Sequence, residues 1–254
     1  MAPLPRIACF HGGGSNGAIF EVQCARLQDL LKTELEFVFF DAPFVRSAGP
    51  GVLPAFETYA PFRTWFKTDA DGKLVGDGSG YDAVGTDGIE RVRRLMHSVA
   101  GNPANWVGVM GFSQGTRVVS GMLLDQQRRA TAGIKNDFSF KFGVLCMGGA
   151  APMESHITNS QWNAATTRTG TDMNAGNKQN EAMKLEIELI RLPTLHLHGL
   201  KDVNLMPGRE QLATFFDRST TTLFEIDYHH AMPWNRPDLN QFAKLVKEIY
   251  EHTK

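Results

Sequence analysis

The strongest constraint on this fold is the alternation of short strand-like runs with segments of helical periodicity. The strand-like runs occur at residues 6–10, 36–40, 105–110, 142–147, 194–198 and 222–227. Apolar spacing typical of helices occurs at residues 19–31, 82–99, 114–128, 178–191, 207–217 and 238–252. Strands that alternate with helices form parallel sheets that are buried on both faces. The chain is therefore expected to be an α/β protein with a mostly parallel central sheet.

Two long stretches, residues 43–81 and 152–180, interrupt this alternation. The first is rich in proline, glycine and aromatic side chains, and the second is rich in serine, threonine and asparagine. Insertions of this length in a compact domain tend to be functional or mobile. We expect a lid or pocket wall over 43–81 and a flexible surface segment over 152–180. Neither a repeat nor a linker is visible, so residues 1–254 are expected to form a single domain.

Charge and composition exclude several classes of protein. The chain has 26 Lys and Arg against 27 Asp and Glu, a formal net charge of −1, which argues against a nucleic-acid partner. No secretory signal is visible, and no apolar stretch approaches the roughly 20 residues that span a bilayer. The three cysteines are odd in number and far apart, which favours a reducing compartment. We expect a soluble, cytoplasmic protein without a membrane partner.

The segment Gly111-Phe112-Ser113-Gln114-Gly115 places one serine between two glycines. This spacing also occurs by chance around ordinary loop serines in many proteins, so it does not identify a nucleophile by itself. Here it follows a strand-like run and precedes a helical one, which is the strand–turn–helix context of a nucleophile elbow. Side chains in place of the two glycines would collide with the backbone of so tight a turn. Ser113 is therefore the candidate nucleophile.

A serine nucleophile needs a base, and the base needs an orienting acid. Asp202 follows the fifth strand-like run, and His229 and His230 follow the sixth. Parallel sheets place functional side chains at these carboxyl ends of strands. The order serine, acid, histidine along the chain is that of α/β-hydrolases. Asp202 is the candidate acid, and either histidine can be the base.

Acyl transfer also requires two backbone N–H groups that face the developing oxyanion. Gln114, directly after the candidate nucleophile, offers one of them. The glycine-rich loop after the first strand offers the other, with Gly13 preferred and Gly14 second. A glycine-rich loop can instead bind phosphate, but this loop lacks the spacing of either phosphate-binding fingerprint. His11, at the start of the loop, can orient it by hydrogen bonding.

His196 and His198 share one face of a strand and are followed by Asp202, which raises the possibility of a metal site. In metallo-hydrolases with an H-x-H-x-D-H pattern the carboxylate lies at a different offset. We therefore interpret His196 as a histidine of the core or of the pocket rim. Neither a metal ion nor a cofactor is expected.

Taken together, these stretches resemble the fungal "family of serine hydrolases" branch of the α/β-hydrolases, whose relatives include the ovarian tumour-suppressor-candidate hydrolases and fungal polyketide-releasing thioesterases such as the lovastatin-pathway enzyme. The resemblance spans nearly the whole chain in order. Its motifs are His11-Gly12-Gly13-Gly14-Ser15-Asn16, Pro61-Phe62-Arg63-Thr64-Trp65-Phe66, Gly111-Phe112-Ser113-Gln114-Gly115, His198-Gly199-Leu200-Lys201-Asp202 and His229-His230-Ala231-Met232-Pro233. The family usually has glycine where His229 stands, and the H-x-x-P spacing points to His230 as the base.

The resemblance implies an α/β-hydrolase fold and a serine hydrolase with the triad Ser113, Asp202 and His230. It implies thioesterase activity that releases a polyketide or fatty acyl chain from a carrier protein or CoA. A carboxylesterase or lactonase that acts on small esters is the first alternative. A non-catalytic binding protein is the second, although such proteins usually lose a triad residue. Substrate contacts are expected from Gly14, Phe62, Trp65 and Met206.

Overall fold

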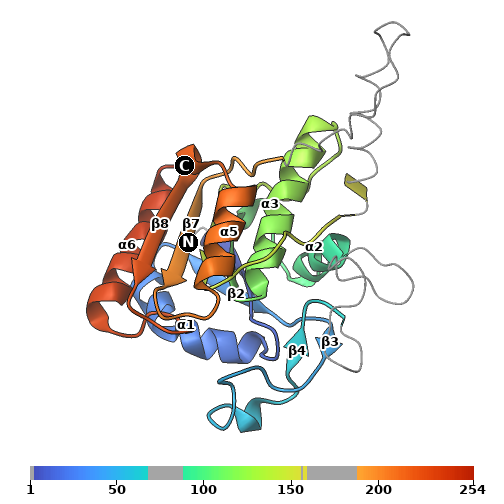
Figure 1. The fold of residues 1–254 in the computed structure, drawn as a ribbon. Helices are drawn as coiled ribbons and strands as arrows, with labels where there is room; N and C mark the ends of the chain where they lie inside the picture. The colour runs from blue at the N-terminus through green and yellow to red at the C-terminus, as the bar shows by residue number, and fades with distance from the viewer. Residues whose placement is uncertain (1–2, 68–87, 156, 159–187) are drawn as a thin grey trace, which may run out of the picture.

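The centre of the molecule is a six-stranded sheet (Figure 1). The computed structural model describes residues 3–67, 88–155, 157–158 and 188–254. The strands lie in the order β2-β1-β5-β6-β7-β8, and every neighbouring pair is parallel. Their bounds are β1 Arg6–Phe10, β2 Glu36–Phe40, β5 Trp106–Phe112, β6 Phe142–Cys146, β7 Thr194–Gly199 and β8 Thr221–Ile226. The parallel sheet predicted from the alternation is confirmed, and all its carboxyl ends meet at one edge.

The position of each strand in the sheet explains its composition. Every residue of β6 and β7 is buried, because helices cover both faces of these inner strands. In β8, at the edge, only Ile226 is buried, and Leu223 remains 47% exposed. The inner strand β6 is accordingly apolar throughout, whereas the edge strand β8 accommodates threonine and glutamate at accessible positions.

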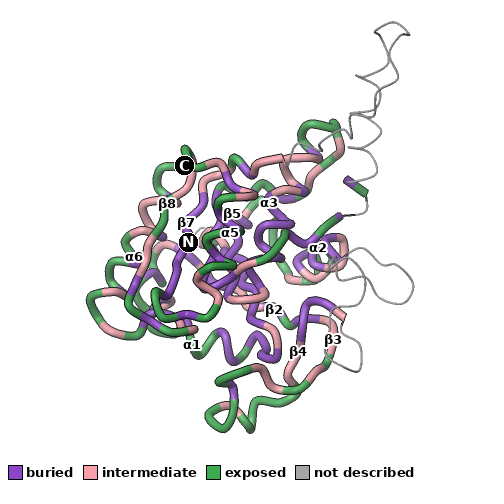
Figure 2. Tube along the Cα trace, in the orientation of Figure 1, coloured by how far each residue is buried: buried purple, intermediate pink, exposed green. Residues whose placement is uncertain are grey.

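Helices cover the sheet on both faces (Figure 1), and Figure 2 shows the buried residues concentrated between the layers. One apolar cluster joins the sheet to α1 and α6. A second cluster, on the opposite face, joins it to α2 and α3, with α5 packed at its side. The helix bounds are α1 Gly17–Leu31, α2 Gly88–Ser98, α3 Gly115–Thr131, α5 Leu205–Phe215 and α6 Arg236–Glu251. No helix in the described ranges is both long and apolar enough to cross a membrane.

Capping side chains set where two of these helices begin. The Asn16 side chain accepts a hydrogen bond from the Ile19 N–H at 2.9 Å, so α1 starts at Gly17, two residues before the apolar periodicity does. The Asn235 side chain accepts one from the Asp238 N–H at 2.9 Å and starts α6 in the same way. Because of these polar capping residues, both helices begin earlier in the chain than their apolar periodicity predicts.

The helix expected over 178–191 is wrong at its described end. Ile190 instead forms a parallel bridge with Phe216, and its N–H donates to the Phe215 carbonyl at 2.8 Å. The same bridge ends α5 at Phe215 rather than at 217. Residues 178–187 of this expectation, and residues 82–87 of the expectation for α2, lie outside the described residues.

The first insertion contributes to the core. It contains the antiparallel pair β3 (Phe44–Val45) and β4 (Arg63–Thr64), together with a 3-10 turn at Glu57–Tyr59. Trp65 and Phe66, each 1% exposed, belong to the apolar cluster on the α2 and α3 face. The insertion is thus anchored beside the carboxyl edge of the sheet. Its expected continuation over 68–81 lies outside the described residues.

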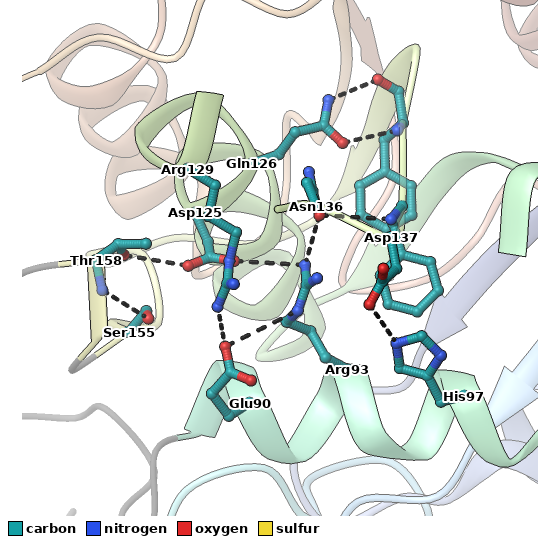
Figure 3. Close-up of polar contacts among 12 residues, drawn as sticks. Glu90, Arg93, His97, Asp125, Gln126, Arg129, Asn136, Asp137, Ser155 and Thr158 are labelled. Atoms are coloured by element: carbon teal, nitrogen blue, oxygen red, sulfur yellow. Dashed lines mark hydrogen bonds and ion pairs between the residues drawn. The ribbon is translucent and has the colours of Figure 1, made fainter. Parts of the chain in front are cut away.

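A buried ionic network joins α2, α3 and the chain after β6 (Figure 3). Asp125, 2% exposed, accepts hydrogen bonds from Arg129 Nε at 2.7 Å and from Thr158 Oγ1 at 3.1 Å. Arg93 Nη1 lies 3.6 Å from the same carboxylate, and Glu90 pairs with Arg129. Burial, followed by the nearby Arg129 charge, lowers the pKa of Arg93. Thr158 is 2% exposed, so the surface segment expected over 152–180 is wrong there; residues 156 and 159–180 lie outside the described residues.

Candidate active site

Ser113 occupies a strained turn between β5 and α3. Its φ of 53° lies in the left-handed region that side chains rarely adopt. A Cβ on Gly111 would collide with the Gly115 carbonyl, and one on Gly115 would collide with the Phe10 carbonyl. The Ser113 N–H donates to the Cys146 carbonyl at 2.8 Å, which ties the turn to β6. The requirement for two glycines in a strand–turn–helix is therefore confirmed.

The loops after β7 and β8 bring a carboxylate and an imidazole together. Asp202 Oδ2 lies 2.8 Å from His230 Nδ1, and Asp202 Oδ1 accepts the Asn204 N–H at 2.8 Å. The Asp202 side chain is only 1% exposed. A carboxylate only accepts hydrogen bonds, so Nδ1 of His230 carries a proton, and in the neutral ring Nε2 is then the acceptor. His229 is exposed, with its Nδ1 3.1 Å from the Lys201 carbonyl. Asp202 thus contacts His230 and not His229.

This pair lies beside the serine turn. The His230 ring centroid is 4.8 Å from that of Phe112, the residue before Ser113. A Cβ on Gly12 would lie 3.2 Å from the Ser113 Cβ, so the loop after β1 also packs against the turn. Within the described residues no hydrogen bond joins Ser113 Oγ to His230; such bonds often tighten only when substrate binds. Loops after β1, β5, β7 and β8 meet here.

His11 holds the glycine-rich loop in place. Its Nε2 accepts the Ala42 N–H at 3.0 Å, so its Nδ1 is protonated and donates to the Gly12 carbonyl at 2.7 Å. Burial lowers the pKa of His11 to about 4, which keeps the ring neutral at pH 7. The Trp65 indole N–H donates to the His11 carbonyl at 2.8 Å. The expectation that His11 orients this loop by hydrogen bonding is confirmed.

The backbone N–H groups of the glycine-rich loop differ in whether they already donate a hydrogen bond. The Gly14 N–H donates to the Arg63 carbonyl at 2.8 Å and is therefore occupied. Among the described residues, no hydrogen bond uses the N–H of Gly13 or of Gln114. A Cβ on Gly13 would lie 3.2 Å from the Gln114 side chain, so these two residues are packed together. Two amides without a hydrogen-bond partner in the described residues thus lie close together, one in the serine turn and one in the loop packed against it.

The side chains expected to contact substrate lie in different environments. Trp65 is 1% exposed, and its ring packs edge-on against Phe10 with centroids 5.4 Å apart. Phe62 is half-buried, and Met206, at the start of α5, is 67% exposed. Trp65 accordingly belongs to the core beneath the glycine-rich loop. Met206 and Phe62 retain accessible surface.

His196 is buried within β7 rather than at a metal site. It is 1% exposed, and its ring lies 4.5 Å from that of Phe216. Burial, followed by nearby His198, lowers its pKa to about 3. Asp202, the third ligand of the metal hypothesis, faces His230 instead. No group of three or more His, Cys, Asp or Glu side chains in the described part of the chain could hold a metal ion.

Two polar groups at the site were not anticipated from the sequence. Asn204 donates its N–H to Asp202, and its side-chain nitrogen lies 3.3 Å from His230 Nδ1. Its position two residues after the acid is typical of a carboxylate that bonds its own backbone in a turn, which was an available signal. The Gln114 carboxamide was also missed, because its neighbour Ser113 suggested only a main-chain role.

Comparison with known proteins places the chain among hydrolases. The family model described as "Serine hydrolase (FSH1)" matches residues 1–242. Esterase citA of Monascus ruber is 32% identical over 252 residues, which cover 98% of this chain and 94% of that protein. Probable esterase tazC of Aspergillus terreus is 31% identical over 256 residues, covering 100% and 94%.

Solved structures agree in fold. Acyl-protein thioesterase 2 of Zea mays aligns with a TM-score of 0.53 at 17% identity, covering 97% of this chain and 94% of that one. Esterase PE8 aligns with a TM-score of 0.53 at 18% identity, covering 98% and 94%. These alignments and the parallel sheet establish the α/β-hydrolase fold. Because the family model spans nearly the whole sequence and the curated relatives match end to end, the chain belongs to the FSH1 family of serine hydrolases.

Proposed function

We propose that this serine hydrolase cleaves acyl esters or thioesters through a triad of Ser113, His230 and Asp202. The observation that supports this best is the 2.8 Å contact between Asp202 and His230 beside a strained serine turn. The contact selects the tautomer of the neutral ring in which Nδ1 carries the proton and Nε2 has the free lone pair, which is the form that a general base requires. The free amides of Gly13 and Gln114 are proposed as the oxyanion donors.

In this mechanism Ser113 Oγ attacks the acyl carbon, and its proton moves to His230 Nε2. The carbonyl π electrons move onto oxygen, where the two amides stabilise the negative charge. Collapse of this intermediate expels the thiolate or alkoxide, which takes the proton from Nε2. Water then attacks the acyl-enzyme by the same route, and the carboxylic acid leaves. Asp202 accepts the Nδ1–H throughout and stabilises the imidazolium.

For the substrate we propose a thioester whose polyketide or fatty acyl chain is released from a carrier protein or CoA. The support is the resemblance to fungal polyketide-releasing thioesterases. Phe62 and Met206, which retain accessible surface, are proposed contacts for the acyl chain, together with the Gly14 backbone. Trp65, which is buried beneath the glycine-rich loop, is proposed to hold that loop in position.

A carboxylesterase that acts on oxygen esters is the second candidate, and the names of the curated relatives favour it. Esterase citA and probable esterase tazC both carry that designation. The two candidates differ only in the leaving group, which the motif around Ser113 does not encode. Turnover of an acyl thioester and of the oxygen ester with the same acyl chain separates them. A preference for the oxygen ester would remove the thioesterase proposal.

Labelling by a fluorophosphonate tests the triad itself. We expect the wild-type protein to be labelled and Ser113→Ala not to be. His230→Ala should lose nearly all turnover, whereas His229→Ala, the matched control on the neighbouring residue, should keep it. An unlabelled wild-type protein would favour the remaining alternative, a non-catalytic binding protein of this fold. Activity that survives in His230→Ala but not in His229→Ala would reverse the assignment of the base.

A further inference from the structure

The Gln114 side chain bridges the serine turn and the first insertion. Its Oε1 accepts the Trp65 backbone N–H at 2.9 Å and the Thr64 hydroxyl at 3.0 Å. Thr64, in β4, is 1% exposed, so this contact lies largely out of water. Two donors on one carbonyl oxygen fix the orientation of the carboxamide.

The same carboxamide lies against the glycine-rich loop. A Cβ on Gly13 would lie 3.2 Å from Gln114 Cδ, 3.2 Å from Nε2 and 3.3 Å from Oε1. Such similar distances to three atoms mean that the flat face of the group lies against the position that a Gly13 side chain would occupy. The side chain therefore touches the residue that offers one proposed oxyanion donor, while its own backbone offers the other.

Further hydrogen bonds join the glycine-rich loop to the Trp65 segment. Trp65, whose backbone binds Gln114, donates its indole N–H to the His11 carbonyl at 2.8 Å. His11 in turn donates to the Gly12 carbonyl at 2.7 Å. A continuous chain of hydrogen bonds thus runs from the serine turn through the Trp65 segment and back to the residue before Gly13.

We propose that the Gln114 side chain is a positioning residue that sets the spacing between the two oxyanion donors. The inference rests on the proposed function. Oxyanion donors act because they are preorganised around the place where charge develops, and small displacements weaken them. Without the Oε1 acceptor, Thr64 and Trp65 lose their link to the serine turn, and the side chain that packs against Gly13 loses its fixed orientation. These donors stabilise the ground state of the substrate only slightly. Their displacement should therefore raise the free energy of the transition state.

Gln114→Met tests this proposal, because methionine keeps the length of the side chain and removes the acceptor. Displacement of the donors predicts a fall in kcat of roughly 10- to 100-fold with KM within about 2-fold of wild type. The affinity for an aryl boronic acid, which imitates the tetrahedral intermediate on Ser113, should fall by a similar factor. Thr64→Val, which removes one of the two donors at constant shape, should change both quantities in the same direction by a smaller factor.

Gln126→Met is the matched control, because Gln126 lies in α3, the helix that begins directly after Gln114. The Gln126 carboxamide also clamps backbone, since it accepts the Phe140 N–H at 2.7 Å and donates to the Phe140 carbonyl at 2.9 Å (Figure 3). Its loss should lower the Tm without changing kcat or boronate affinity.

Three results would overturn the inference. They are wild-type kcat in a folded Gln114→Met, unchanged kinetics in Thr64→Val if Gln114→Met fails to fold, and an equal fall in kcat in Gln126→Met. A wild-type protein without turnover or fluorophosphonate labelling would instead remove the proposed function.

Discussion

Two buried neutral histidines should make the fold sensitive to mild acid. Burial lowers the pKa of His11 to about 4 and that of His196 to about 3, against an unfolded value of about 6.5. As the pH falls below 6.5 the unfolded chain binds protons that the folded chain does not. The free energy of unfolding therefore falls between about pH 6.5 and the folded pKa of each histidine. Linkage gives a loss of about 2 kcal/mol per histidine between pH 7 and pH 5.

Urea unfolding at pH 7 and pH 5 measures this loss, and His196→Leu isolates one contribution. Leucine cannot titrate, and the Nε2 of His196 has no hydrogen-bond partner to lose in the described residues. The pH-dependent loss in His196→Leu should therefore be about 2 kcal/mol smaller than in wild type. Leu195 is a buried residue of β7 that does not titrate. Leu195→Ala should therefore lower the free energy of unfolding by the same amount at pH 7 and at pH 5. A pH dependence in His196→Leu equal to that of wild type would refute the reasoning.

Three further outcomes follow from the geometry. Asp202→Asn would present a donor to His230 Nδ1 and leave the proton on Nε2, so kcat should fall by roughly 10⁴-fold in an ester hydrolysis assay; a fall of less than tenfold would contradict this. Gly111→Ala places a Cβ against the Gly115 carbonyl, so urea unfolding should show a destabilisation of about 3 kcal/mol or more, and an unchanged midpoint would contradict the steric argument. Asp125→Ala leaves two buried arginines without their shared carboxylate, and the free energy of unfolding should fall by about 3–5 kcal/mol, with a loss below 1 kcal/mol as the contrary result.

Local patterns predicted the sheet well, because its strands are short buried runs. β1 and β2 begin and end at the residues predicted for them, and Gly111 and Gly115 marked the serine turn by a steric need that depends on nearby backbone. Patterns failed where distant residues decided the conformation. The end of the helix expected over 178–191 is one case, since Ile190 forms a bridge with Phe216, which follows α5. The buried end of the polar segment at Thr158 is another, because its partner Asp125 lies on α3.

The sequence by itself determined the α/β class, the serine turn and the order of the candidate acid and base, because each depends on periodicity or on glycine spacing within a few residues. Only the tertiary structure decided the contacts among separate loops. In the folded chain Asp202 contacts His230, and the Gly14 N–H donates a hydrogen bond. Trp65 is buried beneath the glycine-rich loop. The Gln114 carboxamide lies between β4 and that loop. These choices depend on how far apart the strand ends lie in space, and spacing along the chain does not specify that distance.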